Sequence, residues 1–337
     1  MALTIYDISK QAGVSIATVS RVLNGNTNVK ASTREKVMKV IEENDYAPNA
    51  FARGMGLRSL HTIGLLCADS SDIFLAKAVY YIEQELQANG YESLLCCTGY
   101  DLDVKKKYLN LIMSKKVDAL VLVGSNFVGI NPEDNEYIRE AAQQVPVMLL
   151  NAHYDCDNVY GILSDDYRSM FEVTTNMINS GLKDILYIYH SETFSSNKKR
   201  TGYSDAMKNG CDNSNDGMIY KYDGDIYDTD AVAAFIENIA KTTHFSAVLA
   251  SEDALAIGAL KYAYNNNISV PNELTIVGHN NSLLCTCANP ALTSIDNRLE
   301  TVSLQLVKTL MNVLAGEEMP KRTVYPGTLV KRETSLF

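Results

Sequence analysis

The sequence predicts a chain of two parts, a small N-terminal helix-turn-helix domain and a larger two-lobed α/β domain built on parallel sheets. Three observations predict it. Two short amphipathic segments meet at Gly13 within residues 4–23. From residue 62 onward, short and nearly continuous apolar segments alternate with helical patterns, which is typical of strands buried on both faces. The length of 337 residues suffices for a head and one or two α/β domains with separate cores.

The first helix is expected to begin at about Ile5. Thr4 precedes it as a candidate N-cap, and Asp7 follows three residues later, an arrangement that resembles a capping box and suits the helix dipole. Gly13 then provides the unhindered backbone that a tight turn needs. The expected buried face of this helix comprises Ile5, Ile8 and Ala12.

A second helix is expected after Ser15, whose hydroxyl can cap it. Ala17 and Arg21 are four residues apart and share a face. An arginine can donate two hydrogen bonds to guanine, and the small Ala17 beside Ile16 allows close approach to bases, so this face fits the major groove of DNA. An ordinary surface hairpin, with Arg21 as a solvated charge, would have the same spacing. The expected inward residues are Val19, Val22 and Leu23.

A third helix is expected to pack on the first two through Val37, Val40 and Ile41, with Ser32 and Glu35 as a candidate capping box. Pro48 ends this helix and allows a short one over residues 49–56, which its glycines weaken. A flexible linker is the alternative for that segment.

Several segments of the chain resemble the lactose-repressor (LacI/GalR) family of bacterial transcription regulators. They are T-I-Y-D-I-S-K-Q-A-G-V-S-I-A-T-V-S-R-V-L-N-G, T-R-E-K-V, Y-A-P-N-A-F-A-R, H-T-I-G-L-L and, near the C-terminus, L-V-K-R-E-T-S. The resemblance implies a cytoplasmic, sequence-specific regulator, expected to be a repressor, that a sugar or sugar-like effector controls. It further implies a homodimer on double-stranded operator DNA, with a tetramer left open.

The resemblance also divides the chain into a DNA-binding domain over residues 1–47, a hinge helix and linker over 48–60, and an effector-binding and dimerisation domain over 61–337. In the family the hinge helix becomes ordered on the operator, and an apolar side chain of this helix inserts into the minor groove. Relatives commonly have a leucine at this position, and this chain has Met55. Together with Ile16 and Ala17, Met55 implies an operator with a central C-G step. The expected DNA contacts are Thr4, Ser15, Ile16, Ala17, Thr18, Ser20, Arg21, Asn24, Asn28, Asn49 and Met55.

The larger domain is expected to form two doubly wound lobes, with a ligand cleft at the carboxyl ends of their strands. The expected strands lie within residues 62–67, 119–124, 145–151, 184–189, 246–251 and 274–279, and two of the covering helices within 76–89 and 299–315. The family's periplasmic-binding-protein-like architecture implies three crossings between lobes, near Gly161, Asn289 and Lys321. The first lobe is then about 62–161 plus 290–320, and the second about 162–289 plus 321–337.

By the same resemblance, the expected effector contacts are Asp72, Phe74, Leu75, Asp165, Lys199, Arg200, Glu252 and Asn280. Three of them depart from the family: Lys199 replaces an arginine, Glu252 an asparagine and Asn280 an aspartate. Because lysine is a point charge and asparagine is both donor and acceptor, the effector is not expected to bind in the family's commonest way. Asp253 is expected to cap a helix.

Two interpretations of these changes stay open. The effector offers a donor or cation to Glu252 and an oxygen or anion to Lys199, or Arg200 replaces the missing arginine and Asn280 binds an ordinary hydroxyl. Phe74 can stack on a ligand ring or belong to the core.

Composition limits the class of protein. Residues 1–60 carry a net charge of +3 and the remainder −13, which suits contact with phosphates through the head alone. Seven cysteines without a metal or C-x-x-C spacing fit a reducing compartment, and the sequence shows no signal peptide or membrane span.

The chain has no G-x-S-x-G, Walker A or H-E-x-x-H motif, and we expect no enzyme activity, cofactor or metal. The alternatives are an extracytoplasmic-type sugar-binding protein without a regulatory role and a co-repressor-type regulator that senses a nucleobase or another non-sugar metabolite.

Overall fold

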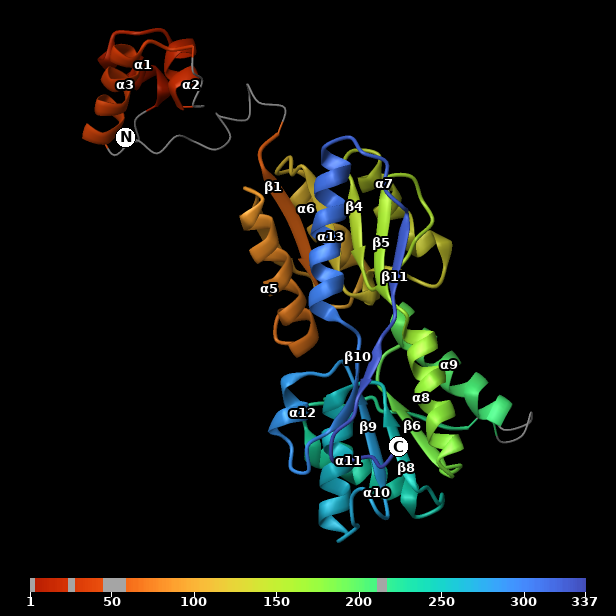
Figure 1. The fold of residues 1–337 in the computed structure, drawn as a ribbon. Coiled ribbons are helices and arrows are strands. Elements are labelled where there is room, and N and C mark those ends of the chain that lie inside the picture. Colours follow the sequence, from red (N-terminus) through yellow and green to blue (C-terminus); the bar gives the residue numbers. More distant parts are fainter. Residues whose placement is uncertain (1–3, 24–27, 45–58, 211–216) are drawn as a thin grey trace. The chain divides into compact units, whose positions relative to one another are not determined.

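The computed structural model describes residues 4–23, 28–44, 59–210 and 217–337. They form two compact units, one comprising the chain up to Thr62 with residues 116–118, and the other the rest (Figure 1). The first unit contains three helices of a head, and the second contains two α/β lobes. This confirms the predicted helix-turn-helix head and two-lobed α/β domain, whereas the short hinge helix expected over residues 49–56 lies outside the described residues. In the described ranges, no helix combines the length and apolarity needed to cross a bilayer.

The head contains α1 (Ile5–Ala12), α2 (Ile16–Leu23) and α3 (Ala31–Glu43). The Asp7 carboxylate accepts hydrogen bonds from the backbone N–H of Thr4 at 2.8 Å and from its hydroxyl at 2.7 Å, so the predicted pairing at the start of α1 is confirmed. Gly13 ends the helix with a φ of 63°, a left-handed conformation that glycine adopts without strain.

The inward faces predicted for these helices form the core of the head, which includes Ile8, Ala12, Val19, Val22 and Val37. The predicted start of α3 is wrong. Lys30 is its N-cap and contributes no side-chain hydrogen bond, and Ser32 lies inside the helix rather than at its cap. The Asn44 side chain instead ties the end of α3 to α1 through a 3.0 Å hydrogen bond to Gln11.

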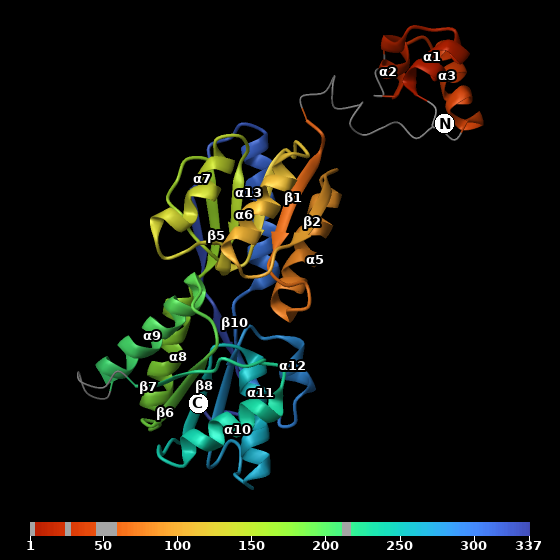
Figure 2. The same cartoon turned by 180° about the vertical axis from the view of Figure 1, so that it is seen from behind.

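The first lobe has a six-stranded sheet in the order β11-β5-β4-β3-β1-β2. The strands are β1 (Thr62–Cys67), β2 (Glu92–Cys97), β3 (Ala119–Val123), β4 (Val147–Leu150), β5 (Val159–Ser164) and β11 (Arg322–Tyr325). Helices α5 (Ile73–Ala88) and α13 (Leu299–Leu314) cover one face, and α6 (Leu102–Met113) and α7 (Glu136–Ala142) the other (Figures 1 and 2). Two 3₁₀ turns, η1 (Ser125–Phe127) and η2 (Pro132–Asn135), follow β3.

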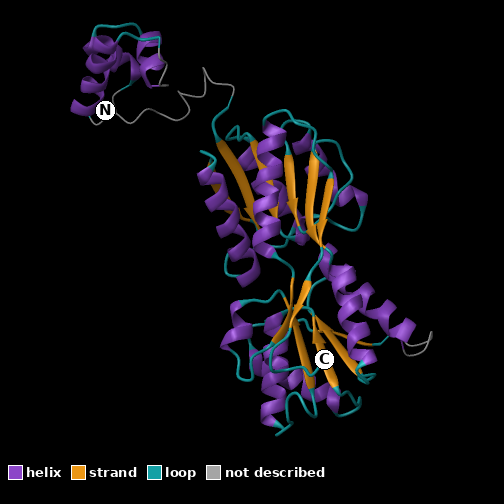
Figure 3. Cartoon of the chain, viewed as in Figure 1, coloured by secondary structure: helices purple, strands orange, loops and turns teal. Residues whose placement is uncertain are grey.

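The second lobe repeats this plan with the strand order β12-β10-β9-β8-β6-β7. Its strands are β6 (Ile185–Tyr189), β7 (Met218–Lys221), β8 (Ala247–Ala250), β9 (Thr275–His279), β10 (Thr293–Asp296) and β12 (Thr328–Val330). Helices α8 (Asp166–Asn179) and α9 (Phe194–Gly210) cover one face, α10 (Thr229–Ala240) and α11 (Asp253–Asn265) the other, and α12 (Leu283–Cys287) follows β9 (Figure 3). Alternate residues of β6 face the two helix layers, and β12 pairs antiparallel with β10.

The chain crosses between the lobes three times, after β5, after β10 and after β11, and the crossing segments lie side by side (Figures 1 and 2). Each crossing comes a few residues later than the sequence analysis expected. Because β5 continues to Ser164 and β11 to Tyr325, residues 162–164 and 322–325 belong to the first lobe. Residues 293–296 form β10 and belong to the second.

Candidate functional site

The solvent-exposed face of α2 carries the side chains that are expected to contact DNA bases. Ala17, Arg21 and Ile16 are exposed, and Ile16 retains 38% of its accessible surface. Ser15 holds the start of the helix, because its hydroxyl accepts a hydrogen bond from the backbone N–H of Thr18 at 3.2 Å. A small residue followed one turn later by an arginine is therefore presented on a helix whose opposite face is core.

The other expected DNA contacts of the head are distributed around this helix. Thr4, Ser15 and Asn28 are exposed, and Thr18 and Ser20 are half-buried. Asn24, Asn49 and Met55 lie outside the described residues, so their expected roles stay predictions.

A cleft lies between the lobes. Its walls come from residues that follow the carboxyl ends of β1, β2, β3 and β4 in one lobe and of β6, β8 and β9 in the other, together with α9. The lining residues are Asp72, Phe74, Leu75, Tyr100, Gly124, Ser125, Asn126, Asn151, His190, Ser191, Thr193, Ser195, Ser196, Lys199, Ser251, Glu252 and Asn280. Across the described ranges, no group of three or more His, Cys, Asp or Glu side chains is placed to hold a metal ion.

Lys199 reaches the cleft from the buried face of α9. This helix packs closely on α8 because Gly202 lies against the backbone carbonyl of Tyr167, where any larger side chain would clash. Lys199 is 5% exposed, and its Nζ donates a hydrogen bond to the backbone oxygen of Ser251 at 3.0 Å. The ammonium thus lies in the wall of the cleft with one of its donors in use.

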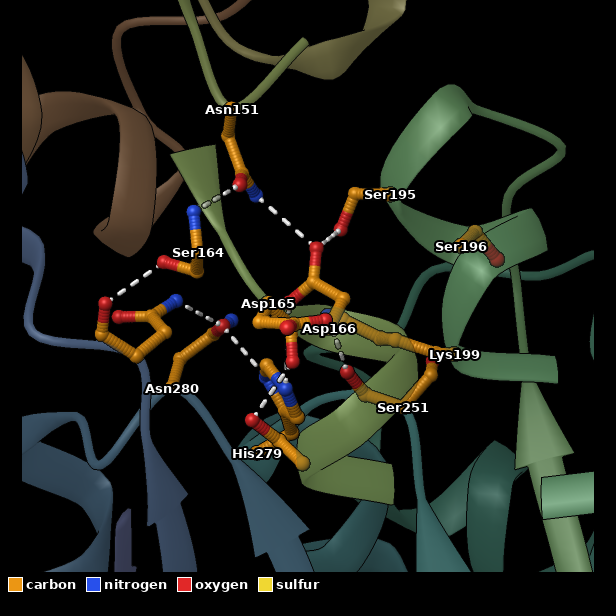
Figure 4. A network of polar contacts seen from close by, with 12 residues as sticks. Asn151, Ser164, Asp165, Asp166, Ser195, Ser196, Lys199, Ser251, His279 and Asn280 are labelled. Carbon is orange, nitrogen blue, oxygen red and sulfur yellow. Dashed lines mark hydrogen bonds and ion pairs between the residues drawn. The ribbon is translucent and has the colours of Figure 1, made fainter. Parts of the chain in front are cut away.

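A network of polar contacts connects the cleft with the crossings between the lobes (Figure 4). Asp166 accepts hydrogen bonds from Ser195 at 2.6 Å and from Asn151 at 3.4 Å. The Asn151 side chain also accepts from the backbone N–H of Ser164, the last residue of β5.

The network continues across the crossings. The Ser164 hydroxyl donates to the backbone oxygen of Asn297 at 2.6 Å, and the Asn297 amide donates to Asn280 at 2.9 Å. Two crossing segments therefore share hydrogen bonds with residues that line the cleft.

A fully buried imidazole lies beneath this network. His279 Nδ1 lies 2.9 Å from the side-chain oxygen Oδ1 of Asn280, and Nε2 lies 3.5 Å from Asp166 Oδ1. Burial lowers the pKa of His279 well below its usual value and raises the pKa of Asp166. Both shifts favour neutral side chains, so we infer that His279 carries its hydrogen on Nδ1 and donates it to Asn280.

Tyr227 bridges the two lobes at the edge of the cleft. It lies between β7 and α10, and its hydroxyl accepts a hydrogen bond from the backbone N–H of Ile73 at 3.2 Å and lies 3.5 Å from the carboxylate of Asp72. Asp72 is also the N-cap of α5, where it accepts from the backbone N–H of Leu75 at 2.8 Å. The first turn of α5 is thus held by a side chain from the opposite lobe.

Glu252 precedes α11 and presents its carboxylate to the cleft. It makes no capping hydrogen bond, and its Oε1 lies 3.6 Å from His190 Nδ1. Burial and the nearby Lys199 lower the pKa of His190 to about 4, so this imidazole is neutral at pH 7. Burial raises the pKa of Glu252 to about 7, and the positive charge of the nearby Lys199 offsets only part of this increase.

Comparison with known proteins identifies the family. Residues 4–49 match the profile described as bacterial regulatory proteins, lacI family, and residues 174–335 match the periplasmic binding protein-like domain. An HTH-type transcriptional regulator from Lachnoclostridium phytofermentans is 44% identical over 335 residues, which cover 99% of this chain and 100% of that protein. The chain belongs to the LacI family.

Further LacI-family proteins agree with this assignment. Catabolite control protein A from Priestia megaterium is 32% identical over 321 residues, 93% of each chain. The Lac repressor dimer bound to operator and the anti-inducer ONPF has a TM-score of 0.87 with full coverage of both chains, at 21% identity. The sequence relatives are transcription regulators rather than enzymes, and the chain is accordingly a DNA-binding transcription regulator of the LacI family.

Of the effector contacts predicted from the LacI-family resemblance, the structure brings together Asp72, Phe74, Leu75, Lys199, Glu252 and Asn280 in the cleft wall. Asp165 and Arg200 are not among the lining residues. Asp165 instead caps α8 by accepting from the backbone N–H of Arg168 at 3.1 Å. Arg200 donates to the Tyr189 hydroxyl at 2.9 Å and pairs with Glu192 at 3.2 Å in this structure.

The expectation that Asp253 caps a helix is wrong. Glu252 occupies the N-cap position of α11, and Asp253 is the first helical residue. The buried Asp253 carboxylate accepts from the Ser294 hydroxyl at 2.5 Å and from the backbone N–H of Ser282 at 2.6 Å. It therefore holds β10 and the turn after β9 together behind the cleft.

Several polar residues of the cleft were not predicted from the sequence. Asn151, His190 and Ser251 directly follow the apolar strands β4, β6 and β8, and this position was a signal that could have found them. Ser195 lies four residues before Lys199 on α9 and shares its face. The position of Asp166, beneath the lining residues, had no such signal.

Glu252→Gln is expected to stabilise the protein at pH 8 by about 1 to 3 kcal/mol and to leave its stability at pH 4 unchanged. The folded pKa of about 7 exceeds the ordinary 4.5, so the wild type loses stability as the pH rises between these values. Denaturant titrations at the two pH values measure the difference, with Glu192→Gln as the exposed control. If Glu252→Gln changed the stability equally at both pH values, the raised pKa of Glu252 would be contradicted. The titratable groups near Glu252 are Asp72, Tyr100, Tyr187, His190, Lys199, Tyr227 and Asp253.

Proposed function

We propose that this LacI-family protein is a repressor that binds a pseudo-palindromic operator as a homodimer and responds to a small polar effector in the cleft between its lobes. The observation that carries the proposal is the continuous hydrogen-bonded network from the cleft through Asn151 and Ser164 to Asn297. A ligand that changes the contacts of Asn280 acts on the segments that join the lobes.

The head supports the DNA-binding half of the proposal. Arg21 and Ala17 are exposed on the helix that follows the turn, which is the helix that enters the major groove in helix-turn-helix proteins. A dimer would place two such helices on two half-sites. The structurally similar Lac repressor is described as a dimer bound to operator, which agrees with this arrangement. Insertion of Met55 into the central step of the operator is part of the same proposal.

The chemistry of the cleft supports a sugar-like effector. Hydroxyl and amide side chains dominate its lining, and such groups bind ligand hydroxyls as donors and acceptors. A regulator of similar fold is described as a complex with cellobiose, at a TM-score of 0.70 and 23% identity. Binding of effector and operator must then be linked, each changing the affinity of the other.

A thermal-shift screen against sugars, sugar phosphates, polyols and nucleobases tests the effector half. A compound that binds only the native state raises the melting temperature. The shift should be reduced in Phe74→Ala, which removes a ring from the cleft wall, and retained in Tyr264→Ala, which removes an aromatic ring that is 83% exposed. The proposal would be contradicted if the compounds raised the melting temperatures of Phe74→Ala and of the wild type equally, or if they left operator affinity unchanged.

A further inference from the structure

We propose that the effector carries a protonated amine on a polyhydroxylated frame, and that the amine binds the carboxylate of Glu252. The inference rests on the proposed function, because it names the ligand class of the same cleft. An amino sugar or an amino polyol has the required chemistry.

The charges of the cleft wall do not balance. Among the lining residues, Asp72 and Glu252 carry carboxylates, and Lys199 is the cation. Lys199 already donates a hydrogen bond to the backbone oxygen of Ser251. A ligand with one positive charge would balance this lining, whereas a phosphate or carboxylate would meet two like charges.

Among the described residues, Glu252 forms no salt bridge to a lysine or arginine, although Lys199 lies near enough to lower its pKa. Its side chain is 22% exposed, and its Oε1 lies 3.6 Å from Nδ1 of the His190 imidazole. His190 has its pKa lowered to about 4 and therefore supplies no charge at pH 7. Glu252 also makes no hydrogen bond to the amino end of α11, so its oxygens are available to a ligand donor. A half-buried carboxylate in this state is stabilised by an ammonium group more than by a hydroxyl.

The rest of the cleft suits hydroxyl groups rather than a purely apolar amine. Ser125, Ser191, Thr193 and Ser196 contribute hydroxyls to its wall. The buried Nδ2 of Asn126 has no hydrogen-bond partner within the described residues, so it remains a donor for a ligand oxygen. These groups favour a ligand with several hydroxyls besides its amine.

Isothermal titration calorimetry on the full chain at pH 7 tests the proposal with four matched pairs. Glucamine is compared with sorbitol, and glucosamine, galactosamine and mannosamine with glucose, galactose and mannose. Each pair exchanges an ammonium group for a hydroxyl. At least one amine is expected to bind about tenfold or more tightly than its counterpart, the scale of a hydrogen bond to a charged group. Glu252→Gln should abolish this preference, and Glu192→Gln, at an exposed carboxylate outside the cleft, should retain it.

Three results would overturn the proposal: no amine that binds more tightly than its hydroxyl partner, tighter binding of glucose 6-phosphate than of glucosamine, or an unchanged preference in Glu252→Gln. Operator binding by the same preparations is measured by fluorescence anisotropy. This measurement distinguishes failure of the proposed ligand class from failure of the proposed function. Sequence-specific DNA binding without amine preference refutes the ligand class alone. If the protein shows neither sequence-specific DNA binding nor a preference for amines, the proposed function itself is refuted.

Discussion

Arg21→Ala is expected to weaken operator binding by about 1–3 kcal/mol for each half-site and to remove the preference for guanine at one base pair of that half-site. The exposed position of Arg21, on the same face of α2 as Ala17, is the physical reason. A guanidinium there can donate two hydrogen bonds to the major-groove edge of a guanine, and alanine donates none. The measurement is fluorescence anisotropy with an operator selected from a random DNA pool and with single-base variants of it.

The control for Arg21→Ala is Lys39→Ala, which removes an exposed cation of α3 that pairs with Glu43. The control variant should keep the base preference of the wild type. If Arg21→Ala weakened binding to operator and to random DNA by the same factor, Arg21 would be a phosphate contact and the base-reading assignment would be wrong.

Asp166→Ala is expected to lower the free energy of unfolding of the two-lobed unit by about 2 to 5 kcal/mol. The substitution leaves the buried Ser195 hydroxyl and the Asn151 amide without their shared acceptor. It also removes the carboxyl group that faces His279 in the fully buried part of the network. Urea unfolding followed by far-ultraviolet circular dichroism measures the change.

The neighbouring Asp165→Ala is the matched control, because it removes a carboxylate of the same type one residue earlier. Asp165 caps α8 through one hydrogen bond, so its loss should cost only about 1 kcal/mol. A cost for Asp165→Ala that equals or exceeds that of Asp166→Ala would show that the buried network does not stabilise the lobes.

The head was predicted well because its signals are local. The Thr4 and Asp7 pairing, the left-handed Gly13 and the Ser15 cap each depend on residues a few positions apart. The start of α3 was missed because Lys30 ends the preceding turn without any side-chain cap, so the polar residues that follow it misled the prediction.

The errors in the cleft share one physical cause. Three pairs of adjacent like-charged residues are involved. Asp165 with Asp166 and Glu252 with Asp253 lie at helix starts, and Lys199 with Arg200 lies within α9. Neighbouring residues on a helix point about 100° apart, so a one-residue shift decides which side chain is buried and which faces solvent or ligand. Tertiary packing of the strand-to-helix turns determines at which residue each helix starts. Local sequence patterns carry no information about this packing.

The crossings were placed early for a related reason. An apolar segment predicts a strand, but the sheet to which its last residues belong depends on pairing with strands far away in the chain. Ser164 and Tyr325 pair with each other in the first lobe, and Asp296 pairs with Thr328 in the second. These long-range pairings became visible only in the structure.

The most direct test of the regulator is a linkage measurement on one preparation of the full chain. The Kd of the selected operator is measured with and without a cleft ligand from the thermal-shift screen, and the Kd of that ligand is measured with and without operator. If the two sites are linked, both affinities change by the same factor, about fivefold or more, and Asn280→Ala reduces that factor. A ligand that binds the cleft with equal affinity on free and operator-bound protein would contradict it.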